Sequence, residues 1–209
     1  MIVILDYGMG NSGSILNMLR KVGGDAIISS DVADIKAAKG IILPGVGAFD
    51  NGMEKLNQLG LIPVLRERVL EEKVPFLGVC LGMQLLLTGS EEGNSLGLNW
   101  IPGKARRFDF KDIKDNKRLK IPHMGWNIVK PKEQETLFAN CTEEERFYFV
   151  HSFAVECDNN DHILATAEYG YNFSCAIHKN NIYGVQFHPE KSHKFGMNMF
   201  KNFMEMVKC

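Results

Sequence analysis

Cys80 is the residue in this chain best placed to act as a nucleophile. It lies in the segment 78–82 (GVCLG), between an apolar run at 76–79 and the helix-like apolar spacing of 83–87. This pattern is the G-x-C-x-G form of a nucleophile elbow, a tight turn from a buried strand into a helix. The turn holds the sulfur above the sheet edge, and the free amides at the helix start favour the thiolate. The alternative is a buried structural cysteine, which is the commoner case for an isolated cysteine.

His188 is the candidate base for this nucleophile. It follows the strand-like run 182–187, and Pro189 prevents that strand from continuing. His188 therefore lies at a strand end, where catalytic residues of open α/β sheets gather. Glu190 is near enough in the chain to orient the imidazole and stabilise its protonated form, as a cysteine nucleophile requires. A capping or core histidine beside a solvated carboxylate is the alternative, and the His-Pro-Glu triplet alone is a weak signal.

The glycine-rich loop 44–47 (PGVG) follows another predicted strand. Its glycines allow successive backbone amides to point into one space, which is what stabilisation of a tetrahedral oxyanion requires. A plain strand-to-helix turn fits the same residues equally well.

A second glycine pattern points to a different class of protein. Residues 8–13 (GMGNSG) fit G-x-G-x-x-G after a strand and before a helix, and Asp31 follows about twenty residues later, as in a dinucleotide-binding module. Against this, Asp6 and Tyr7 separate the strand from the first glycine, and the carboxylate would repel a pyrophosphate. The second half also lacks the βαβ series of a second nucleotide-binding half. A dinucleotide-binding module using Gly8 to Gly13 stays an open alternative.

The elements that position these residues alternate in the first ninety residues. Apolar runs predict strands at 2–5, 26–28, 40–43 and 76–79. Helical spacing is expected after residue 12, at 34–38 and from Pro63 to about Glu72. Strands that alternate with helices predict right-handed βαβ units and a mostly parallel central sheet flanked by helices, the α/β class.

The second half predicts an antiparallel β extension of that sheet. Strand-like runs at 127–130, 147–150 and 163–166 follow one another without long helices. Asn180 and Asn181 form a plausible hairpin turn between 173–178 and 182–187. The spacing of Met199, Phe200 and Phe203 predicts a closing helix. No repeat or linker divides the chain, so we expect a single domain over residues 1–209.

Composition limits the classes of partner and site. The chain has 209 residues and a net charge of −1, so nucleic acid and anionic membranes are not expected partners. Its five cysteines include no C-x-x-C pair, which favours a reducing, cytoplasmic location and neither a metal site nor a disulfide framework. No cofactor is expected. The eight basic residues within 104–120 are interpreted as a solvated, mobile connection, with a phosphate or partner contact as the alternative.

Together the motifs resemble the class I (triad) glutamine amidotransferases, and within them the glutaminase subunits of imidazole glycerol phosphate synthase. The resemblance covers nearly the whole chain. Its segments are 6–11 (DYGMGN), 43–49 (LPGVGAF), 78–84 (GVCLGMQ), 123–127 (HMGWN), 148–153 (YFVHSF) and 184–192 (GVQFHPEKS).

The resemblance implies a role for each matching residue. Cys80 would attack the amide of L-glutamine, His188 would shuttle the proton and Glu190 would hold the histidine. Val46 and Gly47 would lie on the oxyanion loop, with the Leu81 amide as second donor. The glutamine site would be lined by Gln84, His151, Ser152 and Phe153. The face that delivers ammonia to a (β/α)8-barrel cyclase subunit, in a heterodimer serving histidine biosynthesis, would hold Met9, Asn11, Trp126, Tyr148 and Lys191.

One departure keeps the acceptor open. Family members commonly have Leu-Arg after the asparagine at 11, where this chain has Ser12 and Gly13. The same fold also serves paralogues that amidate sugars of surface polysaccharides, so that pathway is an alternative. A free-standing cysteine hydrolase of γ-glutamyl compounds is a further one.

Overall fold

The parallel part of the sheet positions the candidate site. The computed structural model describes residues 1–113, 119–133, 136–139 and 144–208. Five strands pair in parallel in the order β2-β1-β3-β4-β12. Their bounds are β1 Ile2–Leu5, β2 Ala26–Ser29, β3 Gly40–Leu43, β4 Phe76–Val79 and β12 Ile182–Val185. β12 returns from the far end of the chain to pair with β4, so the segments after both strands leave the same edge of the sheet.

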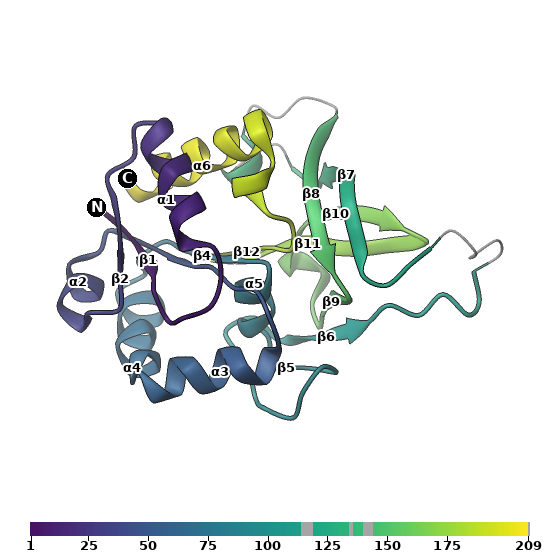
Figure 1. Ribbon diagram of the computed structural model, residues 1–209, viewed down its shortest axis with the longest axis horizontal. Coiled ribbons are helices and arrows are strands. Elements are labelled where there is room, and N and C mark those ends of the chain that lie inside the picture. The colour runs from purple at the N-terminus through teal and green to yellow at the C-terminus, as the bar shows by residue number, and fades with distance from the viewer. Residues whose placement is uncertain (114–118, 134–135, 140–143, 209) are drawn as a thin grey trace.

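Helices cover both faces of this sheet (Figure 1). One face carries α1 (Ser12–Lys21) and α6 (His193–Lys208), and the other carries α2 (Val32–Ala37), α3 (Phe49–Gln58), α4 (Leu61–Arg66) and α5 (Leu81–Leu85). The alternation along β1 explains the two layers: Ile2 and Ile4 pack into one core, and Val3 and Leu5 into the other. The predicted α/β architecture is confirmed.

The antiparallel extension is also confirmed and continues the sheet beyond β12. The path runs through β11, β10, β7 and β8, and a side branch of β9, β6 and β5 leaves β11. Figure 1 shows this part projecting to one side of the helical layers. The bounds are β5 Gly89–Ser90, β6 Gly103–Arg107, β7 His123–Pro131, β8 Glu145–His151, β9 Phe153–Cys157, β10 Ile163–Tyr169 and β11 Tyr171–Lys179. Short 3-10 helices cover Thr136–Phe138, Asn160–His162 and Pro189–Lys191.

Two features of the first half differ from the prediction. The sequence pattern did not indicate α3, because Gly52 interrupts its apolar spacing; in the fold this glycine lets α3 pack closely against Leu85. The helix predicted from Pro63 begins at Leu61 and continues as a π-helix over Glu67–Glu71.

The basic segment 104–120 is in part a strand. Lys104 and Arg106 lie on β6, where Arg106 forms ion pairs with Glu91 and Glu156. The expectation of a mobile connection is therefore wrong at its start, because β6 pairs with β9. Lys114, Lys117 and Arg118 lie outside the described residues. Within the described part of the chain, no helix is long and apolar enough to span a membrane.

Candidate active site

Cys80 occupies a strained turn between β4 and α5. Its φ of 55° and ψ of −109° are values that L-residues rarely adopt. The turn is held by the Cys80 amide, which donates to the Val185 carbonyl at 2.8 Å. Its glycines are required by close approach: a Cβ on Gly78 would lie 2.5 Å from the Gly82 oxygen, and one on Gly82 would lie 2.0 Å from the Leu43 oxygen. The backbone thus exposes the sulfur at the sheet edge, as the elbow pattern predicts.

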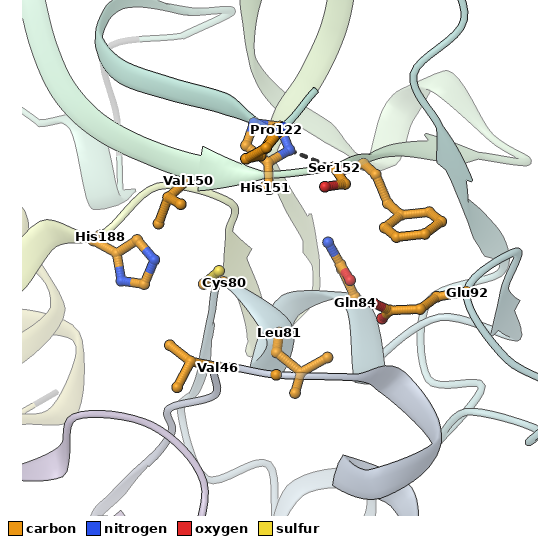
Figure 2. Close-up of a pocket in the computed structure, with 12 residues that line it drawn as sticks. Val46, Cys80, Leu81, Gln84, Glu92, Pro122, Val150, His151, Ser152 and His188 are labelled. Atoms are coloured by element: carbon orange, nitrogen blue, oxygen red, sulfur yellow. Dashed lines mark hydrogen bonds between the residues drawn. The ribbon is translucent and has the colours of Figure 1, made fainter. Parts of the chain in front are cut away.

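His188 is brought beside Cys80 by the pairing of β12 with β4. Its amide donates to the Tyr148 carbonyl at 2.8 Å, and its own carbonyl accepts from the Ser192 hydroxyl at 2.6 Å, so neighbouring segments fix its backbone. Its Nδ1 lies 2.8 Å from Glu190 Oε1, and these two side chains are only 2% and 3% exposed. Figure 2 shows the other ring nitrogen facing the Cys80 sulfur. Among the described residues, this Nε2 has no other hydrogen-bond partner.

The electrostatics of this group favour a charged histidine. Burial lowers the pKa of His188, but its interactions with Cys80 and Glu190 outweigh burial and raise that pKa to about 9. An imidazolium between a carboxylate and a sulfur stabilises a thiolate and holds a proton ready for transfer.

The other cysteines of the described residues have different surroundings. Burial raises the pKa of Cys157 to about 11 and also raises that of the fully buried Cys175. Both thiols are therefore poorer nucleophiles at neutral pH. Cys141 and Cys209 lie outside the described residues.

The loop 44–47 lies against the elbow and is held from both sides. The Tyr7 hydroxyl donates to the Pro44 carbonyl at 2.7 Å. Gly10 supports the loop from below, since a Cβ there would lie 3.0 Å from the Gly45 nitrogen. The Leu81 amide donates to the Gly45 carbonyl at 3.3 Å. This expected oxyanion donor is therefore engaged by the loop itself, and it becomes free for a ligand only when the Gly45 carbonyl turns away.

A cavity of about 360 Å³ opens over Cys80 (Figure 2). It is lined by Val46, Gly47, Cys80, Leu81, Gln84, Glu92, Pro122, Val150, His151, Ser152, Phe153 and His188. The cavity thus brings together the predicted oxyanion loop, the four predicted glutamine contacts, the cysteine and the histidine. Within the described residues, no group of three or more His, Cys, Asp and Glu side chains is placed to hold a metal ion.

Two residues of the site were missed from the sequence. Glu92 lines the cavity, and its carboxylate accepts from the Phe49 amide at 2.9 Å. Gln186 is fully buried behind the cysteine. Glu92 sits in an irregular segment with no periodic signal. Gln186 stands inside an apolar strand pattern, where an isolated polar residue was the one available sign.

His151 lines the cavity with both ring nitrogens already engaged. Nδ1 lies 2.8 Å from the Phe153 carbonyl and so carries the proton, while Nε2 lies 3.0 Å from His123 Nδ1. His123 Nε2 in turn accepts from the Asn127 amide at 3.3 Å. Burial lowers the pKa of His151 to about 3 and that of His123 to about 4, so both rings are neutral. No His151 nitrogen is left for a ligand, and its ring supports the neighbouring strand.

The residues expected at a partner face divide into two groups. Trp126 and Tyr148 pair across β7 and β8, with Lys191 Nζ 5.8 Å from the Tyr148 ring centroid. This cluster adjoins His188 through the Tyr148 backbone. Met9 packs against Gly47 of the loop. The Asn11 side chain accepts from the Ser14 amide and caps α1, so it is committed to the helix.

The features of the dinucleotide pattern have structural roles. Gly10 permits close packing on Pro44 and Gly45. Asp31 caps α2 by accepting from the Ala33 amide at 2.6 Å. Packing and capping account for both residues without a pyrophosphate.

Comparison with known proteins points the same way. The family model "Glutamine amidotransferase class-I" matches residues 3–207. Imidazole glycerol phosphate synthase subunit HisH 2 of Methanococcus maripaludis is 54% identical over 207 residues, covering 99% of this chain and 100% of that protein. The protein of the same name from Pseudomonas aeruginosa is 49% identical with the same coverage. Subunit HisH of Bdellovibrio bacteriovorus is 47% identical over 206 residues, covering 99% and 100%.

Solved structures support the fold. A putative GMP synthase protein from Thermoplasma acidophilum superposes with a TM-score of 0.73 at 20% identity, covering 99% of this chain and 93% of that chain. A structure described as a glutamine amidotransferase gives a TM-score of 0.73 at 16% identity, with both chains fully covered.

Proposed function

The chain belongs to the class I glutamine amidotransferase family, and from this premise we propose that it is the glutaminase subunit of an imidazole glycerol phosphate synthase. It hydrolyses L-glutamine to glutamate and ammonia. The ammonia passes to a (β/α)8-barrel cyclase subunit that makes imidazole glycerol phosphate and AICAR in histidine biosynthesis. The observation that carries this proposal is the group of Cys80, His188 and Glu190 at the ends of adjacent strands, facing a cavity of amino-acid size.

The first half-reaction forms a thioester. The Cys80 thiolate attacks the side-chain amide carbon of glutamine, a C–S bond forms, and the carbonyl oxygen takes the electron pair. Leu81 N–H, once released by Gly45, and an amide of the loop at Val46 or Gly47 stabilise this oxyanion. When the C–N bond breaks, the nitrogen takes the proton of the His188 imidazolium and leaves as ammonia. The raised pKa of His188 supports this role, because the ring is protonated at neutral pH.

The second half-reaction releases glutamate. Neutral His188 accepts a proton from water, and the resulting hydroxide equivalent attacks the thioester carbon. The C–S bond then breaks, and the thiolate and imidazolium are restored. Glu190 holds the histidine through both steps at 2.8 Å from Nδ1.

The cavity wall on the far side of Cys80 from His188 fits the amino-acid end of the substrate. Figure 2 shows Gln84 and Glu92 on that side. The Glu92 carboxylate is an acceptor of charge opposite to the α-ammonium of glutamine, and Ser152 offers a hydroxyl nearby on the cavity wall. We assign substrate orientation to these groups.

The partner face is assigned to the aromatic cluster next to His188. Trp126 is 47% exposed and Met124 is 62% exposed, so large apolar side chains face solvent here. Lys191 adds a positive charge over Tyr148. This cluster, with Met9 at the loop, would contact the barrel where ammonia leaves the site.

We place the chain in the cytoplasm as a single domain over residues 1–209. The described cysteines Cys80, Cys157 and Cys175 are free thiols, and a thiol nucleophile requires a reducing compartment. One sheet runs from β2 through β12 into the antiparallel strands, which supports one structural unit.

A second candidate keeps the chemistry and changes the acceptor. Two of the similar relatives carry the number 2 in their names, and this chain has Ser12 and Gly13 beside Asn11 at the start of α1. Both observations favour a paralogue that supplies ammonia for amidation of a surface-polysaccharide sugar. Restoring histidine-independent growth to a strain that lacks its own glutaminase subunit, with the native cyclase co-expressed, would support the histidine pathway. Absence of growth despite active glutaminase would support the sugar acceptor.

The direct test measures glutamate production in three samples: the isolated chain, the chain with its barrel partner, and the complex with acceptor nucleotide. Cys80→Ala is the matched control for background. Turnover that rises at each step supports a gated subunit. Full turnover by the isolated chain would instead favour a free-standing hydrolase, and no glutamate in any sample would refute the glutaminase assignment.

A further inference from the structure

Gln186 lies between the nucleophile and the substrate-binding wall. Its side chain is completely buried, with Nε2 3.7 Å from Cys80 Sγ and Oε1 accepting from Gln84 Nε2 at 2.9 Å. Its backbone amide donates to the Cys175 carbonyl at 2.9 Å, so the residue is fixed at its main chain as well. Both ends of this buried amide therefore have partners, and one partner is the reacting atom.

We propose that Gln186 is a further catalytic residue, which donates a hydrogen bond to the Cys80 thiolate and sets the orientation of the Gln84 amide. This inference rests on the proposed glutaminase function. It adds a second stabilising contact to the sulfur, besides His188. It also connects the charge of the nucleophile to the polarity of the cavity.

The direction of each hydrogen bond follows from the charge on the sulfur. A thiolate only accepts, so Gln186 must turn its NH₂ group toward Sγ and its oxygen toward Gln84. Gln84 must then donate with its own NH₂ group, which leaves its oxygen for other partners. Gln84 and Glu92 both line the cavity. Two acceptors on one wall suit the α-ammonium of an amino acid, so a single charge orders the whole row of side chains.

Packing alone does not explain a glutamine at this position. The neighbouring Val185 and Phe187 are also completely buried, and both are apolar. An aliphatic side chain would fill the same space without the cost of burying an amide. The polar side chain is therefore attributed to its two hydrogen bonds.

The first experiment measures the nucleophile without glutamine turnover. Full-length chain is alkylated with iodoacetamide across a pH series, and the rate at Cys80 is followed by peptide mass spectrometry. Gln186→Met keeps the length of the side chain and removes the donor. Its alkylation midpoint is expected to rise by about one to two pH units, because a hydrogen bond to a charged group is lost. Gln186→Glu keeps the shape and replaces the donor with an acceptor, and its midpoint should rise at least as far.

The matched control is Cys175→Ala, which alters the same buried region without touching Sγ. Its alkylation midpoint is expected to equal that of the unaltered chain. Thermal unfolding is recorded for all variants. If Gln186→Met does not fold, Gln186→Glu decides the question, because it is nearly isosteric with glutamine.

The second experiment uses the complex with the barrel partner and acceptor. Gln186→Met is expected to lower kcat by about 10- to 100-fold and to raise the KM for glutamine, because Gln84 loses its fixed orientation. A folded variant with an unchanged midpoint and unchanged kcat would overturn the proposal. So would a variant that loses only thermal stability. If the unaltered complex makes no glutamate while the midpoint still moves, the proposed function fails and the contact of Gln186 with the thiolate stands.

Discussion

Replacing Glu190 by glutamine tests whether the carboxylate stabilises a charged His188. The substitution keeps an acceptor for His188 Nδ1, which lies 2.8 Å from Glu190 Oε1. The second oxygen, Oε2, has no hydrogen-bond partner among the described residues, so changing it to an amide nitrogen breaks no bond. Glu190→Gln therefore removes a charge and leaves the geometry in place.

The magnitude follows from the pKa of His188. Burial opposes the charged ring, yet the contacts with Cys80 and Glu190 raise its pKa from 6.5 to about 9. That rise corresponds to about 3 kcal/mol of unfolding free energy, at about 1.4 kcal/mol per pH unit. Because the pKa is higher in the folded chain, this stabilisation is fully present below pH 6.5 and is lost as the pH rises through about 9. Without the carboxylate one of the two stabilising contacts disappears while burial remains, so at least half of the effect should vanish.

The assay is urea unfolding of both chains at several pH values from 6 to 10. The unfolding free energy of Glu190→Gln should fall less steeply with pH, by about 1 to 2 kcal/mol over this range. Glu71→Gln, on an exposed π-helix residue, is the control for the change of residue type. In the complex, Glu190→Gln should lower kcat about 10- to 100-fold, and His188→Ala by about 10⁴-fold, since the histidine carries the proton. Equal pH slopes in the two chains, or equal losses of kcat, would refute this reasoning.

Three further predictions concern the nucleophile, the loop and the partner face. A glutamine-analogue electrophile such as 6-diazo-5-oxo-norleucine should form one adduct, at Cys80, and Cys80→Ala should lose about 10⁴-fold or more in activity; an adduct at another cysteine would contradict the assignment. Because Gly45 occupies the Leu81 amide, docking of the barrel with acceptor should raise kcat by about 10²- to 10³-fold with little change in glutamine KM, and a change confined to KM would argue against gating of the oxyanion site. Trp126→Ala should weaken barrel binding about 30-fold by calorimetry, whereas Leu59→Ala, with the same 47% exposure, should not.

The sequence alone determined the local features of this protein. Apolar runs identified the strands of the parallel sheet, because residues buried on both faces need no polar alternation. The glycines at 78 and 82 indicated the elbow, since only a residue without Cβ tolerates backbone atoms at 2.0 to 2.5 Å. Pro189 indicated that the strand before it ends, which put His188 at a strand end.

The tertiary structure decided which of these features meet. Pairing of β12 with β4 brings His188 to Cys80, and that pairing depends on the whole sheet. Only the fold showed that both nitrogens of His151 are engaged and that the Leu81 amide donates to Gly45. Gln186 gave no periodic signal, because its value lies in one contact with a sulfur from a distant strand. Periodicity and turn chemistry are local and can be recognised from neighbouring residues, whereas the partner of a buried donor is set by packing between segments far apart in the chain.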